Sequence, residues 1–259
     1  MRKKYNTYYY RIVLFLTIII LASCSSSNYK NTAITGKQIN INKDISPEKQ
    51  IENFISPYRE HINRDLDSIL AYAPETFDKS QHIKGWQTTI GNLMSDVAFD
   101  KADKLLMQRE NKHVDVCLLN YGGIRAIIPK GNVTARTAYE IMPFENSLLV
   151  IALKGQQITD IANYMADGRK PHPLTGMEII LDKNGNVKKV TVQGQPVQTD
   201  KIYYVATSDY LANGGDNMDF FKKAVTTYDM DYKLRNLYID YFKEVDTLPV
   251  ITTERIITE

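Results

Sequence analysis

The sequence predicts a mixed helix and sheet fold of the α+β class, in a single domain at about residues 47–259 of the 259-residue chain. Three observations predict it. Apolar residues recur at helical spacing early in this region, short apolar runs typical of buried strands follow, and a hairpin pattern surrounds an Asn-Gly pair. The composition, 43% hydrophobic and 24% charged, excludes a disordered or fibrous chain.

The first helix is expected from residue 47. Ser46 is a suitable N-cap, Pro47 suits the first helical position, and Glu48 places a carboxylate where the helix dipole favours it. Pro57 is expected to kink the helix. The apolar residues that recur along one face are Ile51, Phe54, Ile55, Tyr58, Ile62, Leu66 and Ile69.

The later elements follow from the same periodicities. We expect strands at 114–119, 147–153 and 202–207, helices at 92–108, 156–165 and 231–245, and a hairpin of 177–181 and 187–192. Cys117 lies in the first of these apolar runs, which favours a small buried side chain over a reactive thiol. Two cysteines in total exclude a disulfide scaffold and a Cys-rich zinc site.

Residues 1–23 have the pattern of a secretory signal peptide. Basic residues precede an apolar run of about eleven residues, shorter than the roughly twenty that a membrane-spanning helix needs. The following Leu21-Ala22-Ser23-Cys24 resembles the lipobox of bacterial lipoproteins, where the signal is cut before a cysteine that is then lipidated. We therefore expect lipidation at Cys24, a flexible tether up to residue 46, and an exported protein anchored in the bacterial cell envelope, at the outer membrane or cell surface. An incidental cysteine near an ordinary cleavage site is the alternative.

Removal of the signal peptide changes the charge of the protein. Residues 1–23 contain four basic and no acidic residues, so the formal charge falls from +2 to −2. A slightly acidic chain without basic clusters gives no indication of a nucleic-acid partner.

Two expected strands end in polar, glycine-rich turns, Asn120-Tyr121-Gly122-Gly123-Ile124-Arg125 and Tyr210-Leu211-Ala212-Asn213-Gly214-Gly215-Asp216. Glycines let backbone N–H groups approach a ligand, and the guanidinium of Arg125 suits a phosphate or carboxylate. Asp216 could accept hydrogen bonds from sugar hydroxyls, while Phe144 and Tyr210 could stack on a planar ring. Taken singly, such residues are more often parts of ordinary turns, surfaces and cores.

Four motifs occur in a fixed order in this chain. They are Gly91-Asn92-Leu93, the turn ending in Arg125, Met142-Pro143-Phe144-Glu145-Asn146, and the turn ending in Asp216. With them, the chain from about residue 50 to its end resembles the C-terminal, substrate-binding domain of the 5'-nucleotidase family. The resemblance implies that family's mixed fold and a nucleotide or nucleoside ligand.

The resemblance also implies roles for individual residues. Arg125 matches the arginine that grips the substrate phosphate, and Asp216 matches the aspartate that binds ribose hydroxyls. Phe144 and Tyr210 match the two aromatics that clamp the base, although the second is usually phenylalanine, and Asn146 matches an asparagine that contacts the base. The full set of expected substrate-binding residues is Asn120, Gly122, Gly123, Arg125, Phe144, Asn146, Tyr210, Asn213, Gly214, Gly215 and Asp216.

The sequence departs from the family pattern near the implied phosphate site. The family usually carries a phosphate-binding arginine several residues before Gly-Asn-Leu, and residues 84–90 contain none. Lys84 is a candidate substitute, and Trp86 is either a stacking partner for a ligand or a core residue. A weaker phosphate grip is therefore expected. Three motif positions also differ from the usual family residue: Tyr121 replaces a glycine, Met142 a leucine and Glu145 a glycine.

Catalysis in this family depends on two metal ions and an Asp-His pair in a separate N-terminal metallophosphatase domain. The four histidines fall in none of its motifs, and we expect each to be solvated: His61, His82, His113 and His172. We therefore expect no catalytic residue, metal or other cofactor in this chain, and the divalent metals on a partner metallophosphatase.

The sequence leaves open whether the chain is itself an enzyme. The leading hypothesis is a nucleotide-recognition domain that acts with a separately encoded metallophosphatase in phosphoester hydrolysis and nucleotide catabolism. The alternative is a non-catalytic surface lipoprotein that binds nucleosides or nucleotides. A third hypothesis is an interaction protein whose pocket has decayed.

Overall fold

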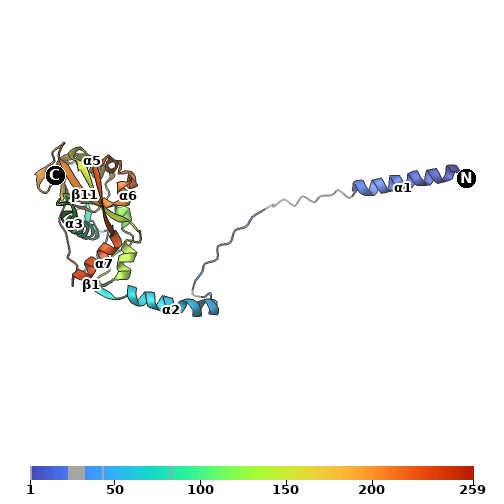
Figure 1. Ribbon diagram of the computed structural model, residues 1–259, viewed down its shortest axis with the longest axis horizontal. Helices are drawn as coiled ribbons and strands as arrows, with labels where there is room; N and C mark the ends of the chain where they lie inside the picture. The colour runs from blue at the N-terminus through green and yellow to red at the C-terminus, as the bar shows by residue number, and fades with distance from the viewer. Residues whose placement is uncertain (1, 23–32, 43, 81, 84) are drawn as a thin grey trace. The chain divides into compact units, whose positions relative to one another are not determined.

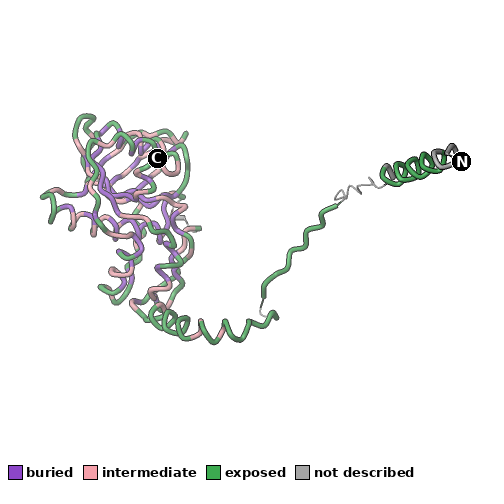
Figure 2. Tube along the Cα trace, turned by 45° about the vertical axis from the view of Figure 1, so that its right-hand side comes forward, coloured by how far each residue is buried: buried purple, intermediate pink, exposed green. Residues whose placement is uncertain are grey.

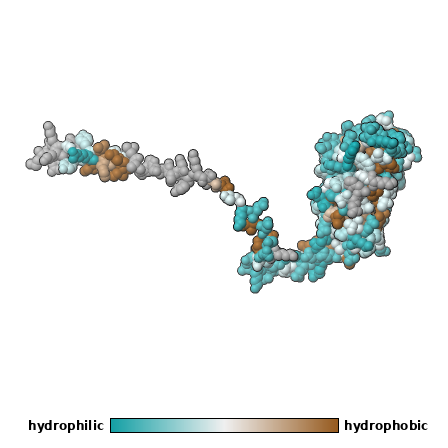
Figure 3. Space-filling model, turned by 180° about the vertical axis from the view of Figure 1, so that it is seen from behind, coloured by the Kyte–Doolittle hydropathy of each residue, from teal (hydrophilic) through white to brown (hydrophobic). Residues whose placement is uncertain are grey.

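The computed structural model describes residues 2–22, 33–42, 44–80, 82–83 and 85–259, in two compact units, Met1–Glu52 and Asn53–Glu259 (Figure 1). The first unit contains α1 (Arg2–Ala22), along which exposed apolar side chains such as Leu14 and Phe15 gather (Figure 3). No helix of the described residues combines the length and apolarity that crossing a membrane requires. The predicted lipidation site, Cys24, lies outside the described residues.

Helices and strands are interspersed after α1 without strict alternation. Helices and 3₁₀ turns are α2 (Lys49–Leu66), α3 (Thr89–Glu110), η1 (Tyr121–Gly123), α4 (Ala135–Ile141), α5 (Gly155–Gly168), α6 (Asp209–Ala212), η2 (Gly215–Asn217), η3 (Asp219–Lys223) and α7 (Leu234–Glu244). Strands are β1 (Ile69–Ala73), β2 (His82–Ile83), β3 (Gln87–Thr88), β4 (Val116–Leu118), β5 (Gly131–Thr134), β6 (Ser147–Lys154), β7 (Leu174–Thr175), β8 (Met177–Leu181), β9 (Val187–Val192), β10 (Gln195–Pro196), β11 (Ile202–Ser208), β12 (Thr226–Lys233) and β13 (Ile256–Thr258). The predicted α+β class is confirmed.

A five-stranded sheet in the order β12-β6-β11-β4-β7 forms the centre of the domain. β6 pairs antiparallel with both of its neighbours, whereas β11 pairs in parallel with β4. A smaller sheet has the order β10-β9-β8-β13 and contains the predicted hairpin, whose turn includes Gly185 at φ +88°. That conformation explains the Asn-Gly pair at this turn.

Buried residues concentrate in the interior of the domain (Figure 2), and the side chains of the central strands alternate between two hydrophobic cores. Leu148 and Val150 of β6 belong to the core that also contains residues of α3, α4 and α7. Ile151 and Leu153 of β6 belong to the other core, together with residues of α5 and the smaller sheet. Because both faces of β6 are buried, its sequence is a continuous apolar run. Cys117 is fully buried, as predicted, and burial raises the pKa of its thiol.

The two terminal helices of the domain differ from the prediction at their ends. α2 begins at Lys49, two residues after Pro47, and continues through Pro57 to Leu66, so Ile69 opens β1 instead of extending the helix. None of the residues of α2 is buried. The predicted start of the last helix at residue 231 is wrong, because β12 continues to Lys233 and α7 begins after it. Pairing of this segment with β6 outweighs its helical pattern.

α3 begins at Thr89, three residues before the predicted start. The signal that the periodicity missed is Thr88, whose hydroxyl accepts a hydrogen bond from the N–H of Gly91 at 3.1 Å and caps the helix. This cap fixes the Gly91-Asn92-Leu93 motif in the first turn. The Asn92 amide then donates to the carbonyls of Ile251 and Thr253, both at 3.1 Å, and so ties α3 to the C-terminal segment.

Candidate functional site

The two glycine-rich turns meet at one edge of the central sheet. β4 and β11 are parallel neighbours, with Val116 opposite Val205, so their carboxyl ends lie side by side. Thr207 donates to the carbonyl of Leu118 at 2.8 Å and ties these ends together. The Met-Pro-Phe-Glu-Asn loop enters the same edge, because β6 starts there, antiparallel to β11. Three of the four motifs therefore converge although they are far apart in the sequence.

The convergence forms a pocket of about 340 Å³. Its lining residues are Asn120, Gly122, Arg125, Phe144, Asn146, Tyr210 and Asp216, all of which the sequence singled out. The rings of Phe144 and Tyr210 are 42% and 43% exposed, so they are surface aromatics and not core residues.

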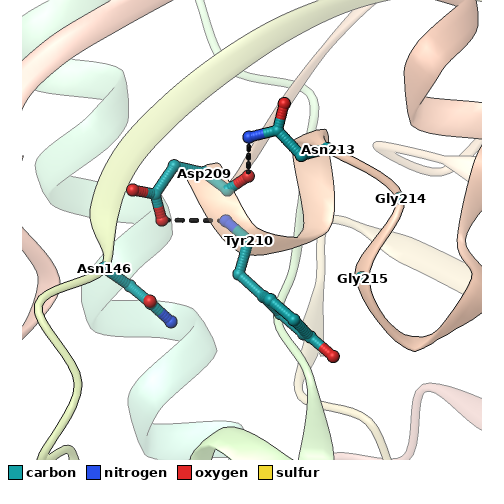
Figure 4. A pocket seen from close by; sticks show the side chains of 6 residues that line it. All are labelled: Asn146, Asp209, Tyr210, Asn213, Gly214 and Gly215. Atoms are coloured by element: carbon teal, nitrogen blue, oxygen red, sulfur yellow. Dashed lines mark hydrogen bonds between the residues drawn. The ribbon is translucent and has the colours of Figure 1, made fainter.

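A second hollow of about 460 Å³ adjoins the pocket (Figure 4). Its lining residues are Asn146, Asp209, Tyr210, Asn213, Gly214 and Gly215, so Asn146 and Tyr210 border both hollows. Two local hydrogen bonds hold its wall: the Asn213 amide donates to the Asp209 carbonyl, and the Tyr210 N–H donates to the Asp209 carboxylate, both at 2.8 Å. Gly123 lines neither hollow. A Cβ at this position would lie 2.8 Å from Oδ1 of Asn120, so the glycine leaves room for the Asn120 side chain.

Arg125 carries the positive charge of the pocket. Its Nη1 donates to the carbonyl of Gly122 at 3.3 Å, and its guanidinium carbon lies 5.9 Å from the ring centroid of Phe144. The planar guanidinium keeps further N–H groups for a phosphate or carboxylate. One wall of the pocket thus offers a fixed cation next to an aromatic face.

Tyr210 and Asp216 are joined by two hydrogen bonds. The Tyr210 hydroxyl donates to Oδ1 of Asp216 at 2.9 Å and accepts from the Asp216 N–H at 3.2 Å. Gly215 makes this possible, since a Cβ there would lie 2.5 Å from the Tyr210 ring. Tyr164 donates to the Asp216 carbonyl at 2.8 Å and supports the turn from behind. These bonds fix the ring of Tyr210, and within the described part of the chain they leave Oδ2 of Asp216 as an available acceptor.

His172 corrects the expectation that every histidine is solvated. It is 3% exposed, its Nδ1 accepts the N–H of Tyr121 at 3.1 Å, and its ring packs 5.7 Å from that of Tyr164. Burial lowers the pKa of His172 to about 4, so the imidazole is neutral and Nε2 carries its proton. His172 thus links the turn that holds Arg125 to the tyrosine behind Asp216. His113, by contrast, is exposed and pairs with Asp103 at 3.0 Å.

Comparisons with known proteins identify the family and the fold of this chain. The family model of the 5'-nucleotidase C-terminal domain matches residues 70–223. The chain belongs to this family. It is 26% identical over 215 residues to the trifunctional nucleotide phosphoesterase protein YfkN of Bacillus subtilis, covering 77% of this chain and 14% of that one. It is 24% identical over 221 residues to protein UshA of Yersinia enterocolitica, covering 82% and 38%.

A solved 5'-nucleotidase precursor from Thermus thermophilus shares this 5'-nucleotidase C-terminal fold. It is 26% identical, with a TM-score of 0.65, over 82% of this chain and 44% of that chain. NAD nucleotidase from Haemophilus influenzae, 18% identical with a TM-score of 0.59, shares the fold. The chain spans less than half the length of each of these relatives.

Residues 84–90, where the family's arginine is missing, hold the two residues that the sequence offered in its place. Trp86 packs half-buried against the second core and donates to Thr258 at 3.2 Å, which favours the core interpretation. Lys84 lies outside the described residues. Sequence reasoning missed Lys79, whose ammonium donates to the carbonyl of Ile124 at 2.6 Å and lies 4.6 Å from the ring centroid of Tyr121. No sequence motif marks Lys79, because its neighbours are 45 residues away in the chain.

Proposed function

We propose that this chain is the nucleotide-recognition part of a 5'-nucleotidase-type phosphoester hydrolase. One observation carries the proposal: a single pocket brings together a guanidinium, two surface aromatic rings and a carboxylate. Its volume, about 340 Å³, falls within the range of small-molecule sites. The family to which the chain belongs and the nucleotidases among its relatives favour a nucleotide over other ligands with an anion and a planar ring.

In this proposal each group of the pocket meets one part of a nucleoside monophosphate. Arg125 binds the phosphate through charge-assisted hydrogen bonds. The base stacks against Phe144 and Tyr210, each ring contributing about 1–3 kcal/mol, and Asn146 contacts its edge. Asp216 accepts a ribose hydroxyl through its available carboxylate oxygen, the other being engaged by Tyr210. Stacking depends little on base identity, so we expect binding to tolerate different bases.

We propose that the hydrolytic step comes from a metallophosphatase on a separate chain. Within the described part of the chain, no group of three or more His, Cys, Asp or Glu residues could hold a metal ion. The metals that activate water in such enzymes would belong to the partner. The partner and this chain would meet at a membrane surface, where lipidated Cys24 and the tether hold the nucleotide-binding domain outside the cytoplasm.

Calorimetric titration of the full chain with AMP and with adenosine tests the recognition role. We expect AMP to bind more tightly than adenosine, and Arg125→Ala to remove that difference. The matched control is Arg109→Ala, because Arg109 is also a surface arginine but contacts Asp229 and Asp231 instead of the pocket. Failure of the wild-type chain to bind either ligand would contradict the proposal.

Hydrolysis assays test the division of labour. With Mn²⁺, the purified chain is expected to leave AMP intact, and addition of the partner metallophosphatase is expected to release phosphate faster than the metallophosphatase alone. Robust turnover by this chain alone would contradict the separate-partner proposal. The alternative is a non-catalytic nucleotide-binding lipoprotein. It would be supported if the chain binds AMP or adenosine tightly but no metallophosphatase hydrolyses AMP faster in its presence.

A further inference from the structure

Lys79 and Tyr121 are far apart in the sequence but meet in space. Residues 84–90, just before Gly91-Asn92-Leu93, contain no arginine, and Tyr121 lies in the turn that ends in Arg125. In the structure the ring of Tyr121 lies under the ammonium of Lys79, with Nζ 4.6 Å from the ring centroid. A glycine at this position would offer Lys79 no aromatic face. Tyr121 and Lys79 therefore form one arrangement at the turn that leads into Arg125.

Lys79 is held next to the phosphate-gripping arginine by two contacts. Its Nζ donates to the carbonyl of Ile124, the residue before Arg125, at 2.6 Å, and the Tyr121 ring provides a cation–π contact. Among the described residues, one donor of the ammonium is used, which leaves two. Lys79 does not line the pocket itself, but its flexible stem is anchored to the backbone of the pocket wall.

The electrostatic surroundings of Lys79 favour an anion. The carboxylate of the preceding Asp78 is engaged by the N–H and hydroxyl of Ser80, both at 2.8 Å. Burial and then the positive charge of Arg125 lower the pKa of Lys79, and they outweigh the negative charge of Asp78, which acts in the opposite direction. A ligand with two negative charges would attract both cations and offset their mutual repulsion.

We propose that Lys79 is the second cation of the phosphate-binding site, that Tyr121 holds it there in place of the missing arginine, and that the site is thereby selective for a dianionic phosphate monoester. This inference rests on the proposed nucleotide-recognition function. A phosphate monoester carries nearly two negative charges at pH 7, and Arg125 alone supplies one positive charge. Lys79 would contact the phosphate as a single point charge, whereas an arginine would offer two parallel N–H donors.

The test compares AMP and adenosine binding by calorimetry in the full chain. Lys79→Met is expected to weaken AMP binding by about fivefold and to leave adenosine binding within about twofold of wild type, as for a partly exposed ion pair. Lys79→Arg keeps the charge and is expected to restore most of the AMP affinity. Lys201→Met is the matched control, because Lys201 lies 4.8 Å from the Tyr203 ring centroid but away from the pocket, and it should change neither affinity.

A double-mutant cycle tests the role of Tyr121. Tyr121→Leu is expected to weaken AMP binding by about twofold to fivefold, the range of an exposed cation–π contact. Combined with Lys79→Met it should cause little further loss, because both changes remove the same positioned charge. If Lys79→Met leaves the AMP affinity unchanged while Arg125→Ala abolishes the preference for AMP, the role of Lys79 is overturned and the proposed function stands. No AMP binding by the wild-type chain would overturn the proposed function and this inference together.

Discussion

Replacing Gly215 by alanine displaces the ring of Tyr210 without touching the ligand. The added Cβ would lie 2.5 Å from two ring carbons of Tyr210, and ordinary contact starts near 3.4 Å, so the ring must move by about 1 Å. Such a shift breaks the 2.9 and 3.2 Å hydrogen bonds between Tyr210 and Asp216. At about 1 kcal/mol each, these bonds limit the loss of folding free energy to about 2 kcal/mol, because the exposed ring can swing outward.

The same change is expected to affect binding more than stability. Losing one stacking face costs about 1–3 kcal/mol, and a loss near the middle of that range weakens adenosine binding by about thirtyfold. The measurement is calorimetric titration with adenosine, with thermal unfolding recorded for the same samples. Gly168→Ala is the matched control, since a Cβ at Gly168 meets nothing within 4 Å. Adenosine affinity of Gly215→Ala within about twofold of wild type would refute the role given to the Tyr210 ring.

Three further predictions concern single residues. Phe144→Ala is expected to weaken adenosine binding by about tenfold or more in the same assay, whereas Tyr139→Ala, at 43% exposure and outside the pocket, should not; equal effects would contradict a base clamp. The folded pKa of His172, about 4, lies below the usual 6.5, so the unfolded chain binds the extra proton and stability falls as the pH falls through this window. Between pH 7 and pH 4.5 we expect the free energy of unfolding, measured in urea, to fall by about 2 kcal/mol. His172→Asn keeps an acceptor for the Tyr121 N–H and should not show this loss. An equal loss in the variant and the wild type would refute the role of His172. Arg255→Met is expected to lower the free energy of unfolding by about 3 kcal/mol, because the 8% exposed guanidinium donates to both Asp96 oxygens at 2.7 Å; a loss below about 1 kcal/mol would contradict this.

Local patterns in the sequence were sufficient for the central elements of the fold. The continuous apolar run of β6 and the Asn-Gly hairpin follow from backbone rules that act within a few residues. The end of β12 does not, because its last pair joins Lys233 to Ser147, which is far away in the chain. The helical pattern around residue 231 therefore competes with a tertiary contact that periodicity cannot detect.

The same distinction separates the predicted from the unpredicted parts of the site. Arg125, Phe144 and Asp216 lie in ordered motifs, and the structure places all three at one pocket. His172 accepts a hydrogen bond from a residue 51 positions away and Lys79 donates one to a residue 45 positions away, and nothing in their neighbouring sequence distinguishes them from surface residues. Both contact the turn around Tyr121. The motif itself could be identified from the sequence, but the residues that hold it in place could be identified only from the structure.

A crystal structure of the full chain with AMP would test the central claim most directly. We expect the phosphate at Arg125, the base between the rings of Phe144 and Tyr210, and a ribose hydroxyl on Asp216. AMP bound elsewhere on the domain, or a pocket that stays free of AMP at saturating concentration, would contradict it.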